Sequence, residues 1–302
     1  MKVFITGGTG FVGSTMTKRL VETGHEVSVL TRSGAGRRGV REGISLIEGD
    51  PQKRGSWQEK VADHDVIINL AGASIFTLWT SKARRTIMDS RVLTTRNLVD
   101  ALSSCKKGTV LLSASAVGYY GSYEDDRILD ESAPPGDDFL AKVGRKWEAE
   151  AGRAEAFGVR VALCRFGIVM GRRGGALARM APAFRKFMGS PLGSGKQWFP
   201  WIHEEDLFRI MLFVSGQKEI SGPVNCTAPF PVTNEELTRT LAKVLRRPVL
   251  LPAVPGFVLR TLLGEFGDVL LKGQRATPAK LIGAGFEFRF PTLEAALRDL
   301  LG

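Results

Sequence analysis

The sequence opens with Met1-Lys-Val-Phe-Ile-Thr-Gly-Gly-Thr-Gly-Phe-Val-Gly13, a short apolar strand that runs straight into a glycine-rich turn. Gly7, Gly10 and Gly13 are spaced G-x-x-G-x-x-G, and a helical segment follows. Glycine permits the positive φ of such a turn and lets backbone N–H groups approach an anion closely. A helix that starts there directs unpaired amides and a positive dipole end at a phosphate. The stretch therefore predicts dinucleotide binding; the alternative is a tight strand-to-helix turn with no ligand.

Strands alternate with helices of ten or more residues over the first half of the chain. Strands are predicted at 3–6, 26–31, 44–48, 65–70, 109–113 and 159–165, and helices at 14–23, 82–102 and 139–157. Gly24 and Gly158 follow two of these helices, at the position where glycine commonly ends a helix. This alternation is typical of a parallel sheet covered on both faces, which is a doubly wound α/β fold.

The pattern changes after residue 165. Loop-like glycine stretches follow, then a helix at 206–214, a strand at 224–226 and a helix that opens with the capping box Thr233-Asn-Glu-Glu236. We predict a dinucleotide-binding domain over residues 1–165 and a smaller mixed α/β lobe over 166–302 that mainly binds substrate. This prediction leaves room for part of residues 199–230 to rejoin the sheet of the first domain. The ligand is expected in the crevice at the carboxyl ends of the strands.

Composition bounds the class of protein. The 302 residues contain 42 Lys and Arg against 31 Asp and Glu, a net charge of +11, but the basic residues are scattered along the chain. Scattered charge favours a generally basic surface over a nucleic-acid partner. Three distant cysteines fit a reducing compartment, and three widely spaced histidines offer no metal-ligand pattern. No uncharged apolar run approaches the roughly 20 residues of a membrane helix, and the expected location is cytoplasmic.

The residue after the second strand indicates which dinucleotide is bound. An NAD site usually places Asp or Glu there, to hold the ribose hydroxyls. This chain has Arg32, nineteen residues after Gly13, and a cation there suits the 2′-phosphate of NADP. Arg37 and Arg38 can add charge. Asp50 can accept a hydrogen bond from the adenine amino group or simply form the turn before Pro51.

Five stretches together resemble a known family: TGGTGFVG (Thr6–Gly13), NLAG (Asn69–Gly72), SASAVGYYG (Ser113–Gly121), RFGIVMG (Arg165–Gly171) and FPWIHEEDL (Phe199–Leu207). The chain resembles an atypical extended short-chain dehydrogenase/reductase of the epimerase-like subgroup, over nearly its whole length. The resemblance implies a Rossmann-like fold, bound NADP and an undefined small-molecule substrate. It also implies a cofactor floor at Leu70, Ala71 and Gly72, and a homodimer through two long helices is compatible with it.

The usual chemistry of this family needs a Ser, a Tyr and a Lys four residues after the Tyr on one helix. The Lys charge lowers the phenol pKa from about 10, so that the Tyr exchanges a proton near neutral pH. This sequence lacks the pair. Aligned through Glu148, the Tyr position is Leu140 and the Lys position is Gly144; aligned through Lys142, the Tyr position is Asp138.

The remaining candidates follow from the resemblance. Ser115 matches the family's serine, and Tyr119 or Tyr120 can supply the missing acid or pack against the ligand. Arg91 lies in the helix after NLAG and can pair with a phosphate or a carboxylate, or lie on the helix surface. The other cofactor candidates are Gly7, Thr9, Gly10, Phe11, Val12, Gly13, Thr31, Ser113, Phe166, Gly167 and Val169.

An aromatic group of Trp198, Phe199, Trp201 and His203 can wall a substrate pocket or pack in the core. The favoured function is an NADP-binding oxidoreductase that transfers hydride to or from a carbonyl or alcohol carbon, with Ser115 polarising the substrate. A nucleotide-sugar epimerase is a related alternative. A non-catalytic NADP(H)-binding sensor is the alternative from another class, because the Tyr–Lys pair is missing.

Overall fold

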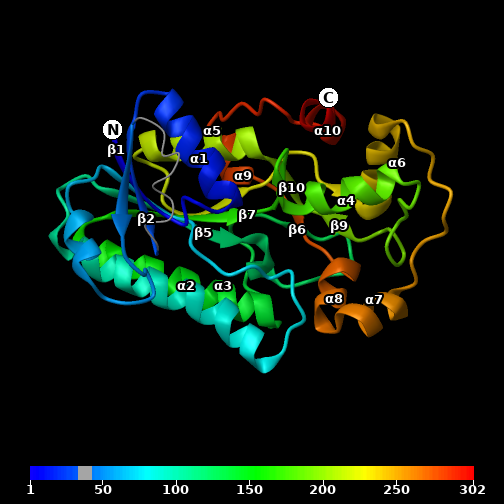
Figure 1. Cartoon of the computed structure of the whole chain (residues 1–302), viewed down its shortest axis with the longest axis horizontal. Coiled ribbons are helices and arrows are strands. Elements are labelled where there is room, and N and C mark those ends of the chain that lie inside the picture. Colours follow the sequence, from blue (N-terminus) through cyan, green and yellow to red (C-terminus); the bar gives the residue numbers. More distant parts are fainter. Residues whose placement is uncertain (33–42) are drawn as a thin grey trace.

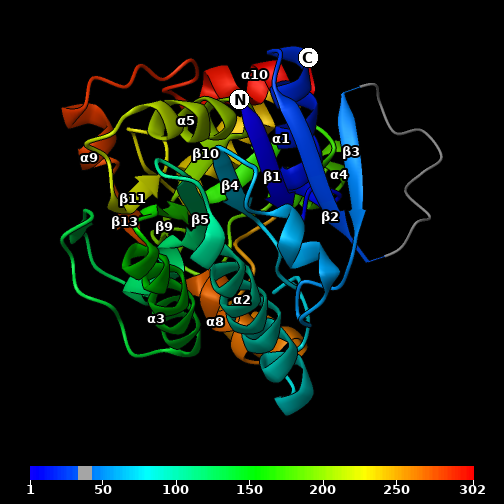
Figure 2. The same cartoon turned by 90° about the vertical axis from the view of Figure 1, so that its left-hand side faces the viewer.

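A seven-stranded parallel sheet forms the centre of the molecule (Figures 1 and 2). The computed structural model describes residues 1–32 and 43–302. The strand order is β11-β7-β5-β4-β1-β2-β3, which is the doubly wound order that the sequence predicts, with one further strand at the β7 edge. The strands are β1 Lys2–Thr6, β2 Glu26–Thr31, β3 Ile44–Glu48, β4 Val66–Asn69, β5 Val110–Ala116, β7 Arg160–Phe166 and β11 Gly222–Cys226.

Side chains of successive strand residues point to opposite faces, and helices cover both faces. Val3 and Ile5 of β1 pack with α1 and α5 on one face, whereas Phe4 packs with α2 and α3 on the other. Figure 1 shows these two helix layers above and below the sheet. The helices are α1 Phe11–Glu22, α2 Ser81–Ala101, α3 Phe139–Gly152, α4 Gly175–Arg185, α5 Glu204–Gly216, α6 Asn234–Leu245, α7 Gly256–Leu263, α8 Glu265–Leu271, α9 Ala279–Gly283 and α10 Leu293–Leu301.

Two helix boundaries differ from the sequence prediction by three residues or more. Helix α1 begins at Phe11 rather than Ser14, because Gly10 is its N-cap and the last residues of the glycine motif already form its first turn. Helix α3 ends at Gly152, and residues 153–157 continue as the 3₁₀ turn η5 (Arg153–Phe157) before Gly158 adopts a left-handed conformation. The first difference matters for function, because it brings the first-turn amides into the glycine-rich turn.

The C-terminal part of the chain builds a second cluster beside the sheet. Helices α4, α6 and α10 pack around Trp201, Leu237 and Leu297. The short pairs β8–β10 (Ile168–Gly171, Trp201–His203), β9–β12 (Trp198–Phe199, Val232–Thr233) and β6–β13 (Ile128–Leu129, Arg275–Ala276) connect this cluster to the sheet. Strand β11 is the edge strand of the sheet and pairs parallel with β7, whereas helix α5 packs on the face of the sheet that α1 also covers. The other 3₁₀ turns are η2 Ser56–Lys60, η3 Leu102–Ser104 and η4 Val117–Tyr120.

None of the helices formed by residues 1–32 and 43–302 is long and apolar enough to cross a membrane. No group of three or more His, Cys, Asp or Glu residues in the same ranges is arranged to hold a metal ion.

Candidate functional site

The glycine-rich turn after β1 has no room for side chains. Gly7 has φ of +72°, and a Cβ there would lie 2.8 Å from the backbone of Leu70 and Ala71. A Cβ on Gly13 would lie 2.0 Å from the carbonyl oxygen of Gly7. Glycine at both positions therefore lets β1, α1 and the end of β4 approach each other directly.

The start of α1 offers backbone donors at this turn. The amide of Ser14 bonds to the carbonyl of Gly10 at 2.8 Å, so the amides of Phe11, Val12 and Gly13 precede the first intrahelical bond. The N-cap Gly10 supplies no side-chain acceptor, and the first turn holds no acidic residue. Thr9 is exposed beside them. A helix start with unpaired amides binds an anionic group such as a phosphate.

Arg32 and Asp50 lie at the ends of neighbouring strands. Arg32 directly follows Thr31, the last residue of β2, and its side chain is exposed without an ion pair to any residue that the structure describes. Asp50 follows β3, and its Oδ1 accepts a hydrogen bond from the amide of Gln52 at 3.1 Å. One carboxylate oxygen thus holds the local turn. Arg37 and Arg38 lie outside the described residues.

Arg91 reaches the carboxyl end of β4 from helix α2. Its Nη1 donates to the carbonyl oxygens of Ala73 at 3.0 Å and Ile87 at 3.1 Å, and its Cζ lies 5.2 Å from the ring centroid of Trp147. Burial lowers the pKa of Arg91 to about 10. No carboxylate among the described residues pairs with it. The guanidinium lies against Gly72, whose added Cβ would be 3.1 Å from Cζ, and it can pair with an anion at this rim.

Ser113 lies inside the sheet layer and not at its rim. It is fully buried, and its Oγ accepts a hydrogen bond from Asn69 at 3.3 Å. Asn69 also donates to Thr95 and accepts from Thr6. These contacts fix the end of β4, and Ser113 takes part in them through Asn69.

Strand β7 ends at the partly buried Phe166, and a sharp change of direction follows. The amide of Gly167 donates to Cys226 at 3.0 Å, and a Cβ on Gly167 would lie 2.7 Å from the carbonyl oxygen of Pro200. Val169 packs beside the main core. The three predicted residues Phe166, Gly167 and Val169 thus join the sheet to the C-terminal cluster at the carboxyl edge.

Ser115 takes part in a buried network of side chains. It is 2% exposed, and its hydroxyl donates to Glu148 Oε1 of α3 at 2.6 Å. Glu148 in turn receives two hydrogen bonds from Arg165 of β7, Nε to Oε1 at 2.9 Å and Nη2 to Oε2 at 2.8 Å. The side chains of this pair are 4% and 8% exposed. The hydroxyl proton of Ser115 is therefore directed at Glu148. Ser115 could polarise a substrate only after breaking its hydrogen bond with Glu148.

Tyr120 continues the network across the sheet. Arg165 Nη1 donates to its phenol oxygen at 2.9 Å, and the phenol donates to Asn225 Oδ1 of β11 at 2.7 Å. Asn225 Nδ2 donates to the carbonyl oxygens of Leu129 and Thr277. Burial raises the pKa of Tyr120 to about 12, against the opposing effect of Arg165. Tyr120 is fully buried, and this environment suits a structural phenol rather than an acid that works near neutral pH.

Tyr119 lies beside the network but has a different environment. Its ring is partly buried, and Arg165 Cζ lies 3.6 Å from the ring centroid. Its hydroxyl forms no hydrogen bond with a residue that the structure describes. Its backbone rests on Gly144 of α3, which is the family's Lys position when the helix is aligned through Glu148.

The aromatic group that includes His203 belongs to the C-terminal packing. His203 is the N-cap of α5, where its Nδ1 accepts from the amide of Glu205 at 3.0 Å, and its ring stacks on Phe290 at 4.0 Å. Burial lowers its pKa. Trp201 is buried in the C-terminal cluster, and Trp198 donates to Asp126. A neutral, capping His203 has its acceptor atom committed to the helix.

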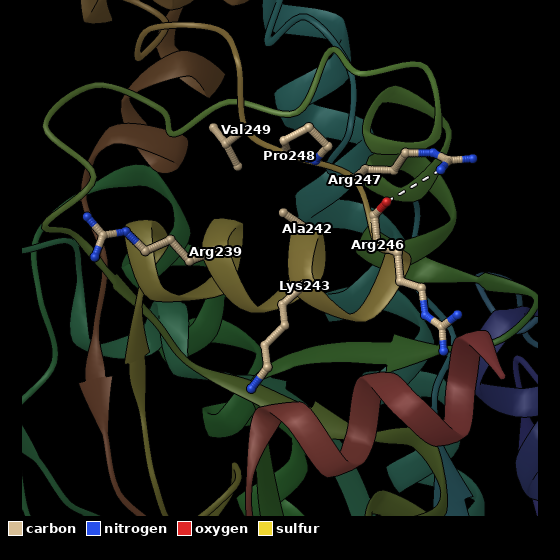
Figure 3. Close-up of a pocket in the computed structure, with 7 residues that line it drawn as sticks. All are labelled: Arg239, Ala242, Lys243, Arg246, Arg247, Pro248 and Val249. Atoms are coloured by element: carbon tan, nitrogen blue, oxygen red, sulfur yellow. Dashed lines mark hydrogen bonds between the residues drawn. The ribbon is translucent and has the colours of Figure 1, made fainter.

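A basic hollow of about 370 Å³ lies on α6, among the C-terminal elements (Figure 3). Its cationic side chains point away from one another, so they do not converge on one anion. Lys243 and Arg239 are engaged with Glu294 and Glu235. The hollow is lined by Arg239, Ala242, Lys243, Arg246, Arg247, Pro248 and Val249.

Sequence reasoning missed the roles of three residues: Glu148, Arg165 and Asn225. A signal existed for two of them. Glu148 lies on the same face of α3 as Gly144 and Ala151, which the pattern assigns to the core, and Arg165 ends an apolar strand. A charged residue on a buried face calls for a charged partner. Which partner it finds depends on the tertiary fold.

Comparison with known proteins shows the family to which the chain belongs. The profile of the NAD dependent epimerase/dehydratase family matches residues 3–226, and that of a domain of unknown function (DUF1731) matches residues 254–300. The chloroplastic epimerase family protein SDR39U1 homolog of Arabidopsis thaliana is 41% identical over 100% of this chain and 87% of the relative.

Two solved structures are similar over the whole chain. The human epimerase family protein SDR39U1, crystallised with NADPH, is 32% identical and covers 99% of both chains, with a TM-score of 0.85. The nucleoside-diphosphate sugar epimerase of Corynebacterium glutamicum is 33% identical, with a TM-score of 0.79, over 100% of this chain and 58% of that one. NADPH, bound by the human relative, is the reduced form of the cofactor that this sequence predicts.

Proposed function

Because the chain belongs to the NAD dependent epimerase/dehydratase family, we propose that it binds NADP(H) and transfers hydride to or from a carbonyl or alcohol carbon of a small molecule. One observation carries the proposal: the turn after β1 excludes side chains and presents unpaired amides, while a cation and not a carboxylate follows β2. The NADPH in the human relative supports the same cofactor.

The residues present fit this cofactor. The amides of Phe11, Val12 and Gly13 would hold the pyrophosphate, and the absence of a Cβ at Gly13 lets the start of α1 lie directly against the backbone of Gly7 and Gly8. Arg32 would pair with the 2′-phosphate. The free oxygen of Asp50 would accept from the adenine amino group. When bound, the cofactor supplies the hydride chemistry.

The rim of the crevice would complete the site. Leu70 and Ala71 lie against Gly7, and Gly72 lies against Arg91; the three residues would form the floor under the dinucleotide. Arg91 projects its guanidinium to the same edge and would neutralise a phosphate or a substrate carboxylate. Phe166 ends β7 at the carboxyl edge, where the nicotinamide would lie.

The test is turnover by the purified protein. It is incubated with NADPH and a panel of aldehydes and ketones, and the absorbance of the reduced nicotinamide is followed. We expect loss of absorbance with at least one carbonyl, faster with NADPH than with NADH. NADPH binding without turnover of any carbonyl would contradict the oxidoreductase.

A second function, that of a non-catalytic NADP(H)-responsive binding protein, is favoured by one specific observation. Helix α3 supplies no phenol in either alignment with the family's Tyr–Lys pair, and the Ser115 proton is held by Glu148. Tight NADPH binding, no turnover and an NADPH-dependent change in protease sensitivity would support this function. A nucleotide-sugar epimerase, the activity named for the Corynebacterium relative, would instead interconvert sugar epimers without net consumption of NADPH.

A further inference from the structure

The turn η4 lies directly on Leu140 and Gly144 of α3, which are the family's Tyr and Lys positions when the helix is aligned through Glu148. A Cβ on Gly144 would lie 3.3 Å from both Cα and Cβ of Tyr119 and 3.5 Å from its Cδ2. A Cβ on Gly118 would lie 3.4 Å from Cβ of Leu140. These distances are tight, so a side chain at position 144 would require the backbone at Tyr119 to shift. Glycine at position 144 therefore lets Tyr119 lie directly on α3.

A cation is present beside Tyr119, but it comes from another element. Arg165 of β7 places Cζ 3.6 Å from the centroid of the Tyr119 ring. The bidentate contact with Glu148 fixes the guanidinium plane, and the edge of Tyr120 meets the Tyr119 ring with centroids 5.6 Å apart. A stacked guanidinium attracts the electron-rich face of the ring. The orientation of the Tyr119 ring is thereby fixed on two sides.

The other hydroxyl groups nearby are already committed. Ser115 donates its proton to Glu148, and the Tyr120 phenol lies between Arg165 and Asn225. Both residues are buried. Tyr123 lies farther along the loop and packs on Arg127. The Tyr119 hydroxyl has no hydrogen-bond partner among the described residues, and of the two tyrosines in η4 it is the one whose hydroxyl lies outside the buried network.

We propose that Tyr119 is the proton donor of the reaction, standing over Gly144 and braced by Arg165 in place of the missing Tyr–Lys pair. The inference rests on the proposed NADP(H)-dependent function. In carbonyl reduction the carbon gains the hydride, the C=O π bond becomes the O–H bond and Tyr119 Oη gives its proton to the oxygen. The phenolate then regains a proton from water on its exposed side. NADPH is oxidised and the carbonyl is reduced to an alcohol; oxidation of an alcohol follows the same steps in reverse.

The Tyr119→Phe variant tests this proposal, because it removes only the hydroxyl and keeps the ring over Arg165. We expect kcat to fall about 100-fold or more, since a general acid contributes a factor of this order. The affinity for NADPH, measured by titration in the absence of substrate, should stay unchanged. Tyr123→Phe is the matched control, and it should keep the kcat of the unaltered protein.

The pH profile separates a proton donor from a structural ring. The residual kcat of Tyr119→Phe should rise as pH falls, because hydronium replaces the phenol. The charged groups that face the ring are Arg165 from β7 and, through it, Glu148 from α3; the neighbouring phenol is Tyr120 of the same turn. These groups are present in both proteins, so a difference between the two profiles belongs to the hydroxyl of residue 119.

The outcomes are distinct. Turnover by the unaltered protein with an equal kcat for Tyr119→Phe overturns the role of Tyr119 and leaves the proposed function standing. Binding of NADPH by the unaltered protein without turnover of any carbonyl overturns the proposed function, and the role of Tyr119 falls with it. A loss of kcat together with a loss of NADPH affinity contradicts a proton donor and indicates a structural ring.

Discussion

The carboxyl edge of the sheet has two halves, and their polar groups find their partners in opposite ways. At the ends of β1, β2 and β4 the polar groups that matter are backbone amides, Arg32 and Arg91, and they lack acidic partners among the described residues. At the ends of β5, β7 and β11 the polar groups are side chains, and Ser115, Glu148, Arg165, Tyr120 and Asn225 satisfy one another in a sealed chain.

The difference distinguishes a binding site from a structural connection. Donors without acceptors cost free energy unless a ligand or water satisfies them, so the first half is suited to an anion. The second half connects α3, β7 and β11, and through Leu129 and Thr277 it reaches the C-terminal segments. It therefore positions the C-terminal part against the sheet. Tyr119, at its margin, keeps a free hydroxyl.

Glu148→Gln should produce the largest effect on stability. It should act only on the half at the ends of β5, β7 and β11, which we call the sealed half. Glutamine keeps the shape of the side chain but leaves Arg165 as a buried charge without its counterion. We expect the free energy of unfolding to fall by about 3–5 kcal/mol, the usual cost of breaking a buried pair from one side. Urea denaturation followed by circular dichroism measures it.

Glu294→Gln is the control for that variant. Glu294 pairs with Lys243 and Arg298 at the surface, where solvent screens the interaction. Its midpoint of unfolding should stay close to that of the unaltered protein. Equal destabilisation by the two variants would mean that the network from Ser115 to Asn225 contributes no more to stability than an exposed ion pair.

Arg32→Ala should change ligand binding only at the ends of β1, β2 and β4, which we call the open half. We expect NADPH affinity to fall about 10-fold or more, because a charge-assisted contact with the 2′-phosphate is lost. The affinity for NADH, which has no 2′-phosphate, should not change, and this provides the control within one protein. Isothermal titration calorimetry gives both constants. A parallel loss of both affinities would assign Arg32 to the fold of the crevice and not to the choice of cofactor.

Acidification should have the smallest effect on the free energy of unfolding, and this effect comes from the titration of His203. Burial lowers the pKa of His203, although Asp299, Asp206 and Glu204 act in the opposite direction. The unfolded chain, with an ordinary His pKa of about 6.5, therefore binds the proton more readily than the folded protein. The contribution of His203 to the free energy of unfolding is therefore fully present above pH 6.5. It decreases as the pH falls from 6.5 to the lowered pKa of His203 in the folded protein.

The expected loss between pH 6.5 and 5.5 is about 1 kcal/mol at most, since one proton changes stability by about 1.4 kcal/mol per pH unit. His64, whose pKa burial also lowers, contributes in the same direction. His203→Asn keeps a cap for α5 and removes the titration, so its unfolding free energy should vary less over this range. An unchanged slope would show that His203 does not titrate on unfolding.

The sequence predicts the open half well because that half depends on backbone geometry. Three spaced glycines, a strand before them and a helix after them lead directly to the turn, the doubly wound sheet and the family, and these predictions are confirmed. Helix α1 begins three residues before the predicted Ser14, because Phe11–Gly13 belong both to the glycine motif and to the first turn of the helix.

The sealed half could be predicted only in part. Alternation along β5 places Ser113 and Ser115 on the same face, toward α2 and α3, and this could have indicated that Ser115 is buried. The contacts of Tyr120 with Asn225 and of Glu148 with Arg165 join elements far apart in the chain. Such pairs follow from how β11 and α3 meet the sheet, which no local pattern specifies.

The most direct test of the central claim is a calorimetric titration of the unaltered protein with NADPH and with NADH under the same conditions. An amide-lined turn followed by Arg32 predicts binding of both, with NADPH tighter by about 10-fold or more. Equal affinities would contradict the role of Arg32. Absence of binding to either nucleotide would contradict the account as a whole.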